Sequence, residues 1–308
     1  MISIFNTNQI PKDISGTAVT IGKFDAVHLG HQQLIREVVG SAQEQMLVPV
    51  VLTFDRHPAS TLNDLEVPVP VIGEKQKERL IADLGVELML SLPFDEDFAR
   101  LSADDFVSKV LVKELNAKVV VVGEGFRFGD KAQGNVELLK RLGDQFGFEV
   151  KVMPHLIFEG KRISTSWIRE LLLQGNVETV AKLLGRYHCT EGLVVHGLKI
   201  GREIGFPTAN MSRDAEGLLP RDAVYAGWLY AEGKTYMTAL SVGTNETFTA
   251  VPRLLEAHIL DIVGLDLYDK VIVCEYVNFI RPAAKFNGVE DLVDEINRDL
   301  EKIRLALG

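Results

Sequence analysis

Residues 17–31 read Thr-Ala-Val-Thr-Ile-Gly-Lys-Phe-Asp-Ala-Val-His-Leu-Gly-His. The first five are apolar or β-branched and end at a glycine, a pattern that predicts a buried strand. After the stretch, apolar residues recur at helical spacing between charged ones, which predicts a helix. His28 and His31 therefore lie where a strand turns into a helix.

This turn is a candidate anion site. Free backbone N–H groups and the helix dipole favour an anion at a helix start, and two imidazoles add two donors that can hold a triphosphate. Two alternatives stay open: the histidines are surface or capping residues, or they bind zinc. Two histidines are too few for zinc, however, and neither Cys189 nor Cys274 is close in sequence.

Strands and helices alternate through the first half of the chain. Apolar, β-rich runs occupy residues 48–54, 87–92, 118–123 and 148–153, and helix-like patterns occupy 74–84, 102–115 and 135–146. Nearly continuous apolar strands separated by helices predict an α/β fold, a Rossmann-like, doubly wound parallel sheet covered on both faces. Ligands bind beyond the carboxyl ends of such strands, where His28 and His31 are expected.

Two further stretches follow predicted strands. Residues 123–129 read Gly-Glu-Gly-Phe-Arg-Phe-Gly, and the two phenylalanines either pack against a planar ligand or belong to the core. Residues 163–169 read Ile-Ser-Thr-Ser-Trp-Ile-Arg and open a helix. Their hydroxyls are either N-caps or, together with the arginine, ligands for phosphate.

The pattern changes near residues 185–189. Short strands separated by glycine-containing turns now predict a β-barrel or sandwich, so the predicted domains are residues 1–185 and 186–308. A hairpin is expected at 224–230 and 234–242, with further strands at 253–261 and 271–279. The last apolar positions, from Val289 to Ile303, are spaced for one face of a helix that packs on the barrel.

Residues 197–210 read Gly-Leu-Lys-Ile-Gly-Arg-Glu-Ile-Gly-Phe-Pro-Thr-Ala-Asn. Glycines four apart form a loop whose amides can wrap phosphates, and Thr208 and Asn210 offer oxygens suited to Mg²⁺. The alternative is a plain glycine-rich connection followed by a turn. Farther on, Glu256 lies in an alternating stretch, where a lone glutamate is usually a solvated residue of a strand.

Three of these stretches resemble one family. Residues 22–31 resemble the Gly-x-Phe-Asp-Gly-x-His-x-Gly-His signature of the nucleotidyltransferase superfamily, as it occurs in bacterial bifunctional riboflavin kinase/FAD synthetases. Residues 163–169 resemble that family's Ile-Ser-Ser-Thr-x-Ile-Arg motif, with Ser166 at the usual threonine. Residues 197–210 are nearly identical to the riboflavin kinase signature that ends in Pro-Thr-Ala-Asn. The motifs occur in the family's order across nearly the whole chain.

The resemblance implies two reactions. A C-terminal riboflavin kinase-type barrel phosphorylates riboflavin to FMN with ATP and Mg²⁺, and an N-terminal nucleotidyltransferase domain adenylylates FMN with a second ATP, giving FAD and pyrophosphate. The implied catalytic residues are His28, His31 and Glu256, the last as the base. The implied ATP or phosphate ligands are Gly22, Phe24, Asp25, Gly30, Ser164, Thr165, Ser166, Arg169, Gly197, Gly201 and Gly205. The implied metal ligands are Thr208 and Asn210, and the implied flavin contacts are Phe126, Phe128 and Arg281.

The chain departs from the family's pattern at three positions. Ala26 and Glu246 stand at a usual glycine and a usual proline, and Gly125 stands at a usual Asn or Asp. If position 26 needs a positive φ, alanine strains the loop. These departures leave open a riboflavin kinase with a weak or inactive adenylyltransferase half. A flavin-sensing protein without turnover is a third reading.

Composition sets the remaining expectations. The chain has 308 residues, of which 46% are hydrophobic and 25% charged, as in soluble two-domain proteins. Its net charge of −10 argues against a nucleic-acid partner, and neither a membrane-spanning run nor a signal peptide is evident. Two distant cysteines indicate reduced thiols in the cytoplasm. We expect small-molecule substrates and a monomer or weak homo-oligomer.

Overall fold

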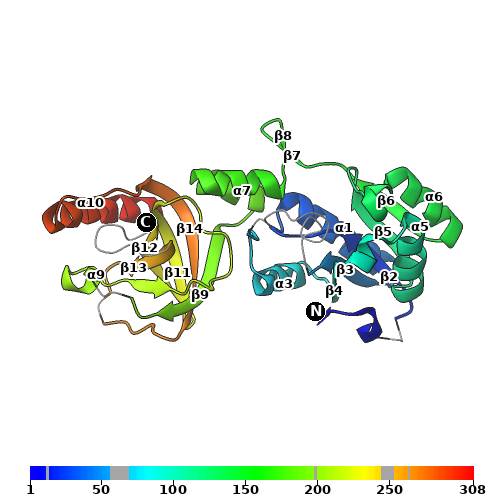
Figure 1. Cartoon of the computed structure of the whole chain (residues 1–308), viewed down its shortest axis with the longest axis horizontal. Helices are drawn as coiled ribbons and strands as arrows, with labels where there is room; N and C mark the ends of the chain where they lie inside the picture. The colour runs from blue at the N-terminus through cyan, green and yellow to red at the C-terminus, as the bar shows by residue number, and fades with distance from the viewer. Residues whose placement is uncertain (12–13, 56–68, 198–199, 244–252, 263) are drawn as a thin grey trace. The chain divides into compact units, whose positions relative to one another are not determined.

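The computed structural model describes residues 1–11, 14–55, 69–197, 200–243, 253–262 and 264–308. By packing, the chain divides into two compact units: residues 1–68 with 74–164, and residues 69–73 with 165–308. Figure 1 shows the elements of each unit. The helices between residues 165 and 184 group with the second unit, and the functional boundary at residue 185 stays a prediction.

The first unit is built on a six-stranded sheet with the strand order β1-β4-β3-β2-β5-β6, parallel at every pair. The strands are β1 (Ile2–Ile4), β2 (Thr17–Ile21), β3 (Val48–Phe54), β4 (Leu88–Leu92), β5 (Ala117–Gly123) and β6 (Glu149–Met153). The chain order reverses direction between β2 and β5. The predicted doubly wound parallel sheet is therefore confirmed, and its switch point lies beside the end of β2.

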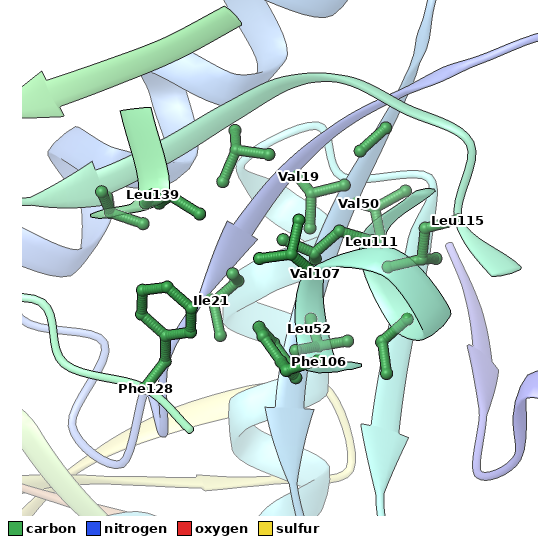
Figure 2. Close-up of a cluster of buried hydrophobic side chains, with 14 of the residues drawn as sticks. Val19, Ile21, Val50, Leu52, Phe106, Val107, Leu111, Leu115, Phe128 and Leu139 are labelled. Carbon is green, nitrogen blue, oxygen red and sulfur yellow. The ribbon is translucent and has the colours of Figure 1, made fainter. Parts of the chain in front are cut away.

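Helices cover both faces of this sheet because its strands are apolar on both faces. On one face, Val19 and Leu52 pack against Val107 and Leu111 in a continuous buried cluster (Figure 2). On the other face, Ala18 and Val119 pack against helix α1. The helices of this unit are η1 (Thr7–Gln9), α1 (Leu29–Gln45), α3 (Glu74–Asp83), α4 (Glu96–Ala99), α5 (Ala103–Asp105), η2 (Phe106–Glu114), η3 (Asp130–Ala132) and α6 (Val136–Phe146).

Two details differ from the sequence-based expectation. The helix predicted over 102–115 is a single α-turn, α5, that continues as the π-helix η2, since apolar spacing does not distinguish the two hydrogen-bond patterns. The sheet also gains an edge strand, β1, at the N-terminus. Three residues are too few to show a strand period.

The second unit is a closed antiparallel barrel with the strand order β10-β13-β12-β11-β14-β9. The predicted barrel is confirmed. Its strands are β9 (His188–Val195), β10 (Ala209–Met211), β11 (Ala223–Ala231), β12 (Lys234–Gly243), β13 (Leu254–Ile259) and β14 (Val271–Pro282), and its helices are α7 (Thr165–Gln174), α8 (Val177–Leu184), α9 (Ile200–Glu203) and α10 (Val289–Leu307). A two-stranded ribbon, β7 (Ile157–Phe158) with β8 (Lys161–Arg162), precedes this unit in the chain.

The expected hairpin and terminal helix are both present. Glu232 and Gly233 join β11 to β12 with φ of 50° and 75°, the left-handed pair that a tight hairpin turn requires. Helix α10 packs Leu300 and Ile303 on the barrel's outer face, against a buried cluster that includes Ala226. The barrel's outer face is therefore partly covered.

One segment of the first half of the sequence packs into the barrel unit. Residues 69–73 form this segment, which we call the strap. Its Val71 and Ile72 are 0% and 3% exposed, whereas Val69 is 58% exposed. The Val71 carbonyl accepts a hydrogen bond from the Leu218 N–H (3.1 Å), and the Val69 carbonyl accepts one from Arg169 Nη2 (3.3 Å). The strap is thus part of the hydrophobic core of the second unit.

Shortening Ile72 should destabilise the barrel unit. Ile72→Ala removes buried methyl groups, for which we expect a loss of about 2–4 kcal/mol in the free energy of unfolding. Val69→Ala, in the same strap but exposed, is the matched control and should change it by less than about 0.5 kcal/mol. Urea unfolding followed by tryptophan fluorescence isolates this unit, because Trp167 and Trp228 are the chain's two tryptophans and both lie in it. Equal midpoints for the two variants would show that the strap is not part of the core.

Candidate functional site

The first candidate site lies where β2 passes into α1. His28 is the N-cap of α1, and its Nδ1 accepts a hydrogen bond from the His31 backbone N–H at 3.2 Å. An imidazole nitrogen that accepts carries no proton, so the neutral ring has its proton on Nε2. His28 therefore caps the helix with Nδ1 and keeps an N–H donor at Nε2. The capping role and the anion-binding role, which the sequence left as alternatives, are thus compatible.

The two histidines form a stack that a phenylalanine supports. The His28 and His31 ring centroids are 3.7 Å apart with an interplanar angle of 13°, and the Phe24 ring meets His31 edge-on at 5.1 Å. Phe24 is fully buried and His28 is 6% exposed. Packing fixes both imidazoles at the carboxyl end of the sheet, where an anion would also meet the first N–H groups of α1.

Side chains pack closely over two glycines of this turn. A Cβ at Gly30 would lie 3.2 Å from His28 Cε1, and one at Gly22 would lie 3.2 Å from the Phe24 ring. Phe24 and Val27, with φ of 51° and 41°, take the left-handed conformation in this turn. Ala26 does not, so the alanine at the family's usual glycine causes no backbone strain of that kind. Asp25, half-buried, lies in the same turn.

The two phenylalanines of the loop after β5 are buried to different degrees. Phe128 is 7% exposed and belongs to the buried core, and Phe126, half-buried, stacks on it with a centroid distance of 5.4 Å. The core reading of this pair therefore has direct support, while a contact with flavin stays a prediction. Gly125, in the same loop, has an exposed backbone.

The hydroxyl-rich motif spans the division between the two units. Ser164 is the last residue of the first unit, whereas Thr165, Ser166 and Arg169 belong to α7 in the second. Arg169 is bonded to the strap through the Val69 carbonyl. The roles of these four residues in phosphate binding stay predictions from the motif.

The second candidate site lies on the outer face of the barrel. In the pairing of β10 with β13, Asn210 lies directly opposite Glu256, and in the pairing of β12 with β13, Ser241 lies opposite the same glutamate. Directly opposed residues of antiparallel strands point to the same face. Leu255 and Ala257, which alternate with Glu256, are 1% exposed and point to the barrel interior.

The Thr208 side chain is a hydrogen-bond partner of Glu256. The glutamate carboxylate accepts a hydrogen bond from the Thr208 side chain. Burial raises the pKa of Glu256 above its ordinary value, and the bond from Thr208 partly offsets this by lowering the pKa. A carboxylate with a raised pKa in a polar cluster on a barrel face is a candidate general base.

Each glycine of residues 197–210 is required for a different reason. A Cβ at Gly197 would lie 2.6 Å from the Asn210 amide, and one at Gly201 would lie 2.4 Å from the Phe206 carbonyl oxygen. Gly205 has a φ of +91°. Gly197 and Gly201 are thus packed closely against Asn210 of β10 and against Phe206, just before Thr208. Residues 198 and 199 of this stretch, like Glu246, lie outside the described residues.

The donor set here fits a hard cation. Thr208, Asn210 and Glu256 present hydroxyl, amide and carboxylate oxygens on one face, and Mg²⁺ prefers oxygen ligands while keeping several waters. Within the described parts of the chain, no three His, Cys, Asp or Glu residues gather where they could hold a metal ion. A threonine–asparagine site of this kind would depend on substrate phosphates to complete its ligands.

Arg281 lies on β14 and connects the barrel to its terminal helix. Its Nε donates to Asp299 Oδ2 of α10 at 2.8 Å and lies 3.5 Å from Glu295 Oε1, and its guanidinium lies over the Phe286 ring at 5.5 Å. The side chain is 16% exposed. These contacts give Arg281 a structural role, and a flavin contact stays a prediction.

Two residues near these sites had no signal in the sequence analysis. His258 Nδ1 lies 2.9 Å from the Pro207 carbonyl oxygen and joins β13 to the glycine-rich loop. His155 follows β6 at the carboxyl edge of the parallel sheet, and its backbone N–H donates to Glu124 Oε1 at 3.0 Å. Applying the strand-end rule to the strand at 148–153 would have singled out His155.

Comparison with known families gives a match for each half. Residues 10–167 match the family model of FAD synthetase, and residues 184–307 match that of riboflavin kinase. Among curated relatives, the bifunctional riboflavin kinase/FMN adenylyltransferase of Escherichia coli (strain K12) is 34% identical over 96% of this chain and 94% of its own. The chain belongs to the bifunctional riboflavin kinase/FMN adenylyltransferase family.

Two further proteins are similar to this chain over nearly its whole length. The family member from Listeria monocytogenes is 35% identical over 93% of this chain and 91% of its own. A Streptococcus pneumoniae protein, whose crystal structure is described as that of a macrolide-efflux protein, is 33% identical and superposes with a TM-score of 0.89 over 98% of each chain. In the present chain, no helix among the described residues has the length and hydropathy of a membrane span.

Proposed function

We propose that this chain makes FAD from riboflavin in two ATP-dependent steps, one in each half. The barrel unit transfers the γ-phosphoryl group of ATP to riboflavin, giving FMN and ADP. The parallel-sheet unit transfers the adenylyl group of a second ATP to FMN, giving FAD and pyrophosphate. The observation that carries this proposal is the match of each half to its own family model, each with its own polar cluster.

In the barrel, Glu256 acts as the general base. It accepts the proton of the riboflavin 5′-hydroxyl as that oxygen attacks the γ-phosphorus and the bond to the β-phosphate oxygen breaks. Thr208 and Asn210 would hold Mg²⁺, which neutralises phosphate charge when bound. Gly197, Gly201 and Gly205 allow the loop backbone to approach the phosphates closely.

In the parallel-sheet unit, the chemistry is the stabilisation of charge. The FMN phosphate attacks the α-phosphorus of ATP, and pyrophosphate leaves with added negative charge. His28 Nε2 and His31 donate to the phosphates, with Gly22, Phe24, Asp25 and Gly30 shaping the turn around them. By motif, Ser164, Thr165, Ser166 and Arg169 are proposed to bind phosphate.

The alternative readings have less support. Ala26 causes no left-handed backbone strain, because its φ is not positive. A flavin sensor without turnover would not need a base, yet Glu256 has its hydrogen-bonded oxygen partner in Thr208. Cys189 and Cys274 are buried and form no disulfide, which agrees with a reducing, cytoplasmic setting.

Matched variants of the two sites should separate the two activities. His28→Asn keeps an N-cap side chain for α1 and removes the imidazole, so FAD formation from FMN should fall by roughly 10²–10³-fold. His28→Ala should lose as much activity and also about 1 kcal/mol of stability with its cap. Both should still form FMN, as chromatography of the products would show. Full FAD formation by His28→Asn would contradict the role of the imidazole.

Glu256→Gln is the reciprocal variant. It preserves shape and removes the base, so FMN formation should fall by roughly 10²–10⁴-fold while FAD formation from supplied FMN continues. The measurements are the rate of FMN formation from riboflavin and the rate of FAD formation from supplied FMN. A variant that phosphorylates riboflavin at the wild-type rate would refute the assignment of Glu256 as the base.

The pH profile of the kinase should depend on Thr208. The base must be deprotonated to act, so kcat falls as the pH drops through the pKa of Glu256. This fall is the acidic limb of the pH profile. Because burial raises the pKa of Glu256, the limb should lie above the ordinary pKa of glutamate. Thr208→Val removes the hydrogen bond that lowers this pKa, so the limb should move to higher pH. Thr208→Ser keeps the hydroxyl and should keep the wild-type limb. Superimposable normalised profiles for the valine and serine variants would contradict this coupling.

A further inference from the structure

In the loop after β5, a neighbouring side chain occupies the space next to Gly125. Gly125 does not have a positive φ, so its backbone would accept any residue. A Cβ at this position would nevertheless lie 3.2 Å from both Cε1 and Nε2 of His155, and 3.7 Å from Arg162 Nη1. The space beside residue 125 is therefore occupied by an imidazole and bordered by a guanidinium.

His155 is held in this place by its neighbours. Its backbone N–H donates to Glu124 Oε1 at 3.0 Å, and its Nε2 lies 3.8 Å from the same oxygen. The side chain is 25% exposed. The next residue, Leu156, lies 3.9 Å from where a Cβ of Gly30 would be, so the segment after β6 runs beside the start of α1.

These contacts place His155 at the same edge of the sheet as His28. Strands β2, β5 and β6 are neighbours and parallel, so the segments after all three meet at their common carboxyl edge. An imidazole and a guanidinium together are suited to the oxygens of a phosphate group. The adenylyltransferase reaction has such groups in both of its substrates.

We propose that His155 is a substrate-binding residue of the adenylyltransferase site, which fills the space left by Gly125 and, with Arg162, binds a phosphate oxygen of the nucleotide substrate. This inference rests on the proposed function of the parallel-sheet unit. The phosphate belongs either to ATP or to FMN, and the two sources give different kinetic results. The glycine at position 125 and the histidine at position 155 are then coupled, because a Cβ at 125 would lie 3.2 Å from the imidazole and the imidazole would have to shift.

The first test is the pair of Michaelis constants of FAD formation in the full-length His155→Ala variant. Loss of a charged phosphate contact should raise one of them about 10-fold or more. A rise in the KM of ATP assigns the contact to the triphosphate, and a rise in the KM of FMN assigns it to the acceptor phosphate. Arg162→Ala should raise the same constant. Unchanged constants for both substrates, even with a lower kcat, would overturn the proposal.

The second test uses the exclusion between the two positions. Gly125→Asn pushes the imidazole out of place, so it should raise the same KM as His155→Ala. The double variant Gly125→Asn/His155→Ala should be no worse than His155→Ala alone, because the asparagine then has room. Multiplicative losses in the double variant would show that the positions act independently and would overturn the exclusion.

The riboflavin kinase activity of the same molecules is the internal control for folding. It should stay at the wild-type level in all four variants, since none of these residues lies in the barrel unit. The wild-type chain also distinguishes failure of the proposed function from failure of the role of His155. If it forms no FAD, the proposed function itself fails, whereas FAD formation with unchanged constants in His155→Ala refutes the role of His155 alone.

Discussion

Strand β2 is buried on both faces at the centre of a parallel sheet, and this constraint determines where the polar groups of the first unit can lie. Its five residues are all buried and uncharged, so charged and imidazole groups lie beyond its carboxyl end, where the chain turns into α1. There His28 satisfies the helix start with Nδ1, and the stack with His31 and Phe24 holds the rings. In the proposed mechanism, the helix cap and the phosphate donor are the same side chain, so the stability of α1 and the geometry of the site would depend on each other.

In the barrel, too, strand packing determines where the polar groups can lie. Antiparallel pairing puts alternate residues of β13 into the interior and leaves Glu256 on the outer face, opposite Asn210. Glycines at 197, 201 and 205 then allow a loop to fold onto that face. The register of β10 and β13 places Asn210, a proposed cation ligand, opposite Glu256, the proposed base. Burial raises the pKa of Glu256. Both sites therefore use groups fixed by packing and pairing, as expected for transfers that depend on positioning and charge neutralisation.

Much of this could be predicted from the sequence because the signals are local. The apolar period of β2, the hairpin at residues 231–234 and the spacing of α10 each occupy one stretch, and each motif keeps its side-chain pattern. What could not be predicted depends on distant pairing. The opposition of Asn210 and Glu256 requires the strand register, the burial of Val71 in the barrel unit has no periodic pattern, and His155 acquires meaning through its contact with Gly125. The π-helix η2 was missed because its side chains repeat much as those of an α-helix do.

The central claim is that one chain carries two separate transfer sites that act in sequence. The measurement that tests it most directly is a time course of products after the purified chain is mixed with riboflavin, ATP and Mg²⁺, with FMN and FAD separated by chromatography. FMN should form first and then be converted to FAD, with one ADP and one pyrophosphate released for each FAD. Accumulation of FMN without any FAD, also when FMN is supplied directly, would contradict it.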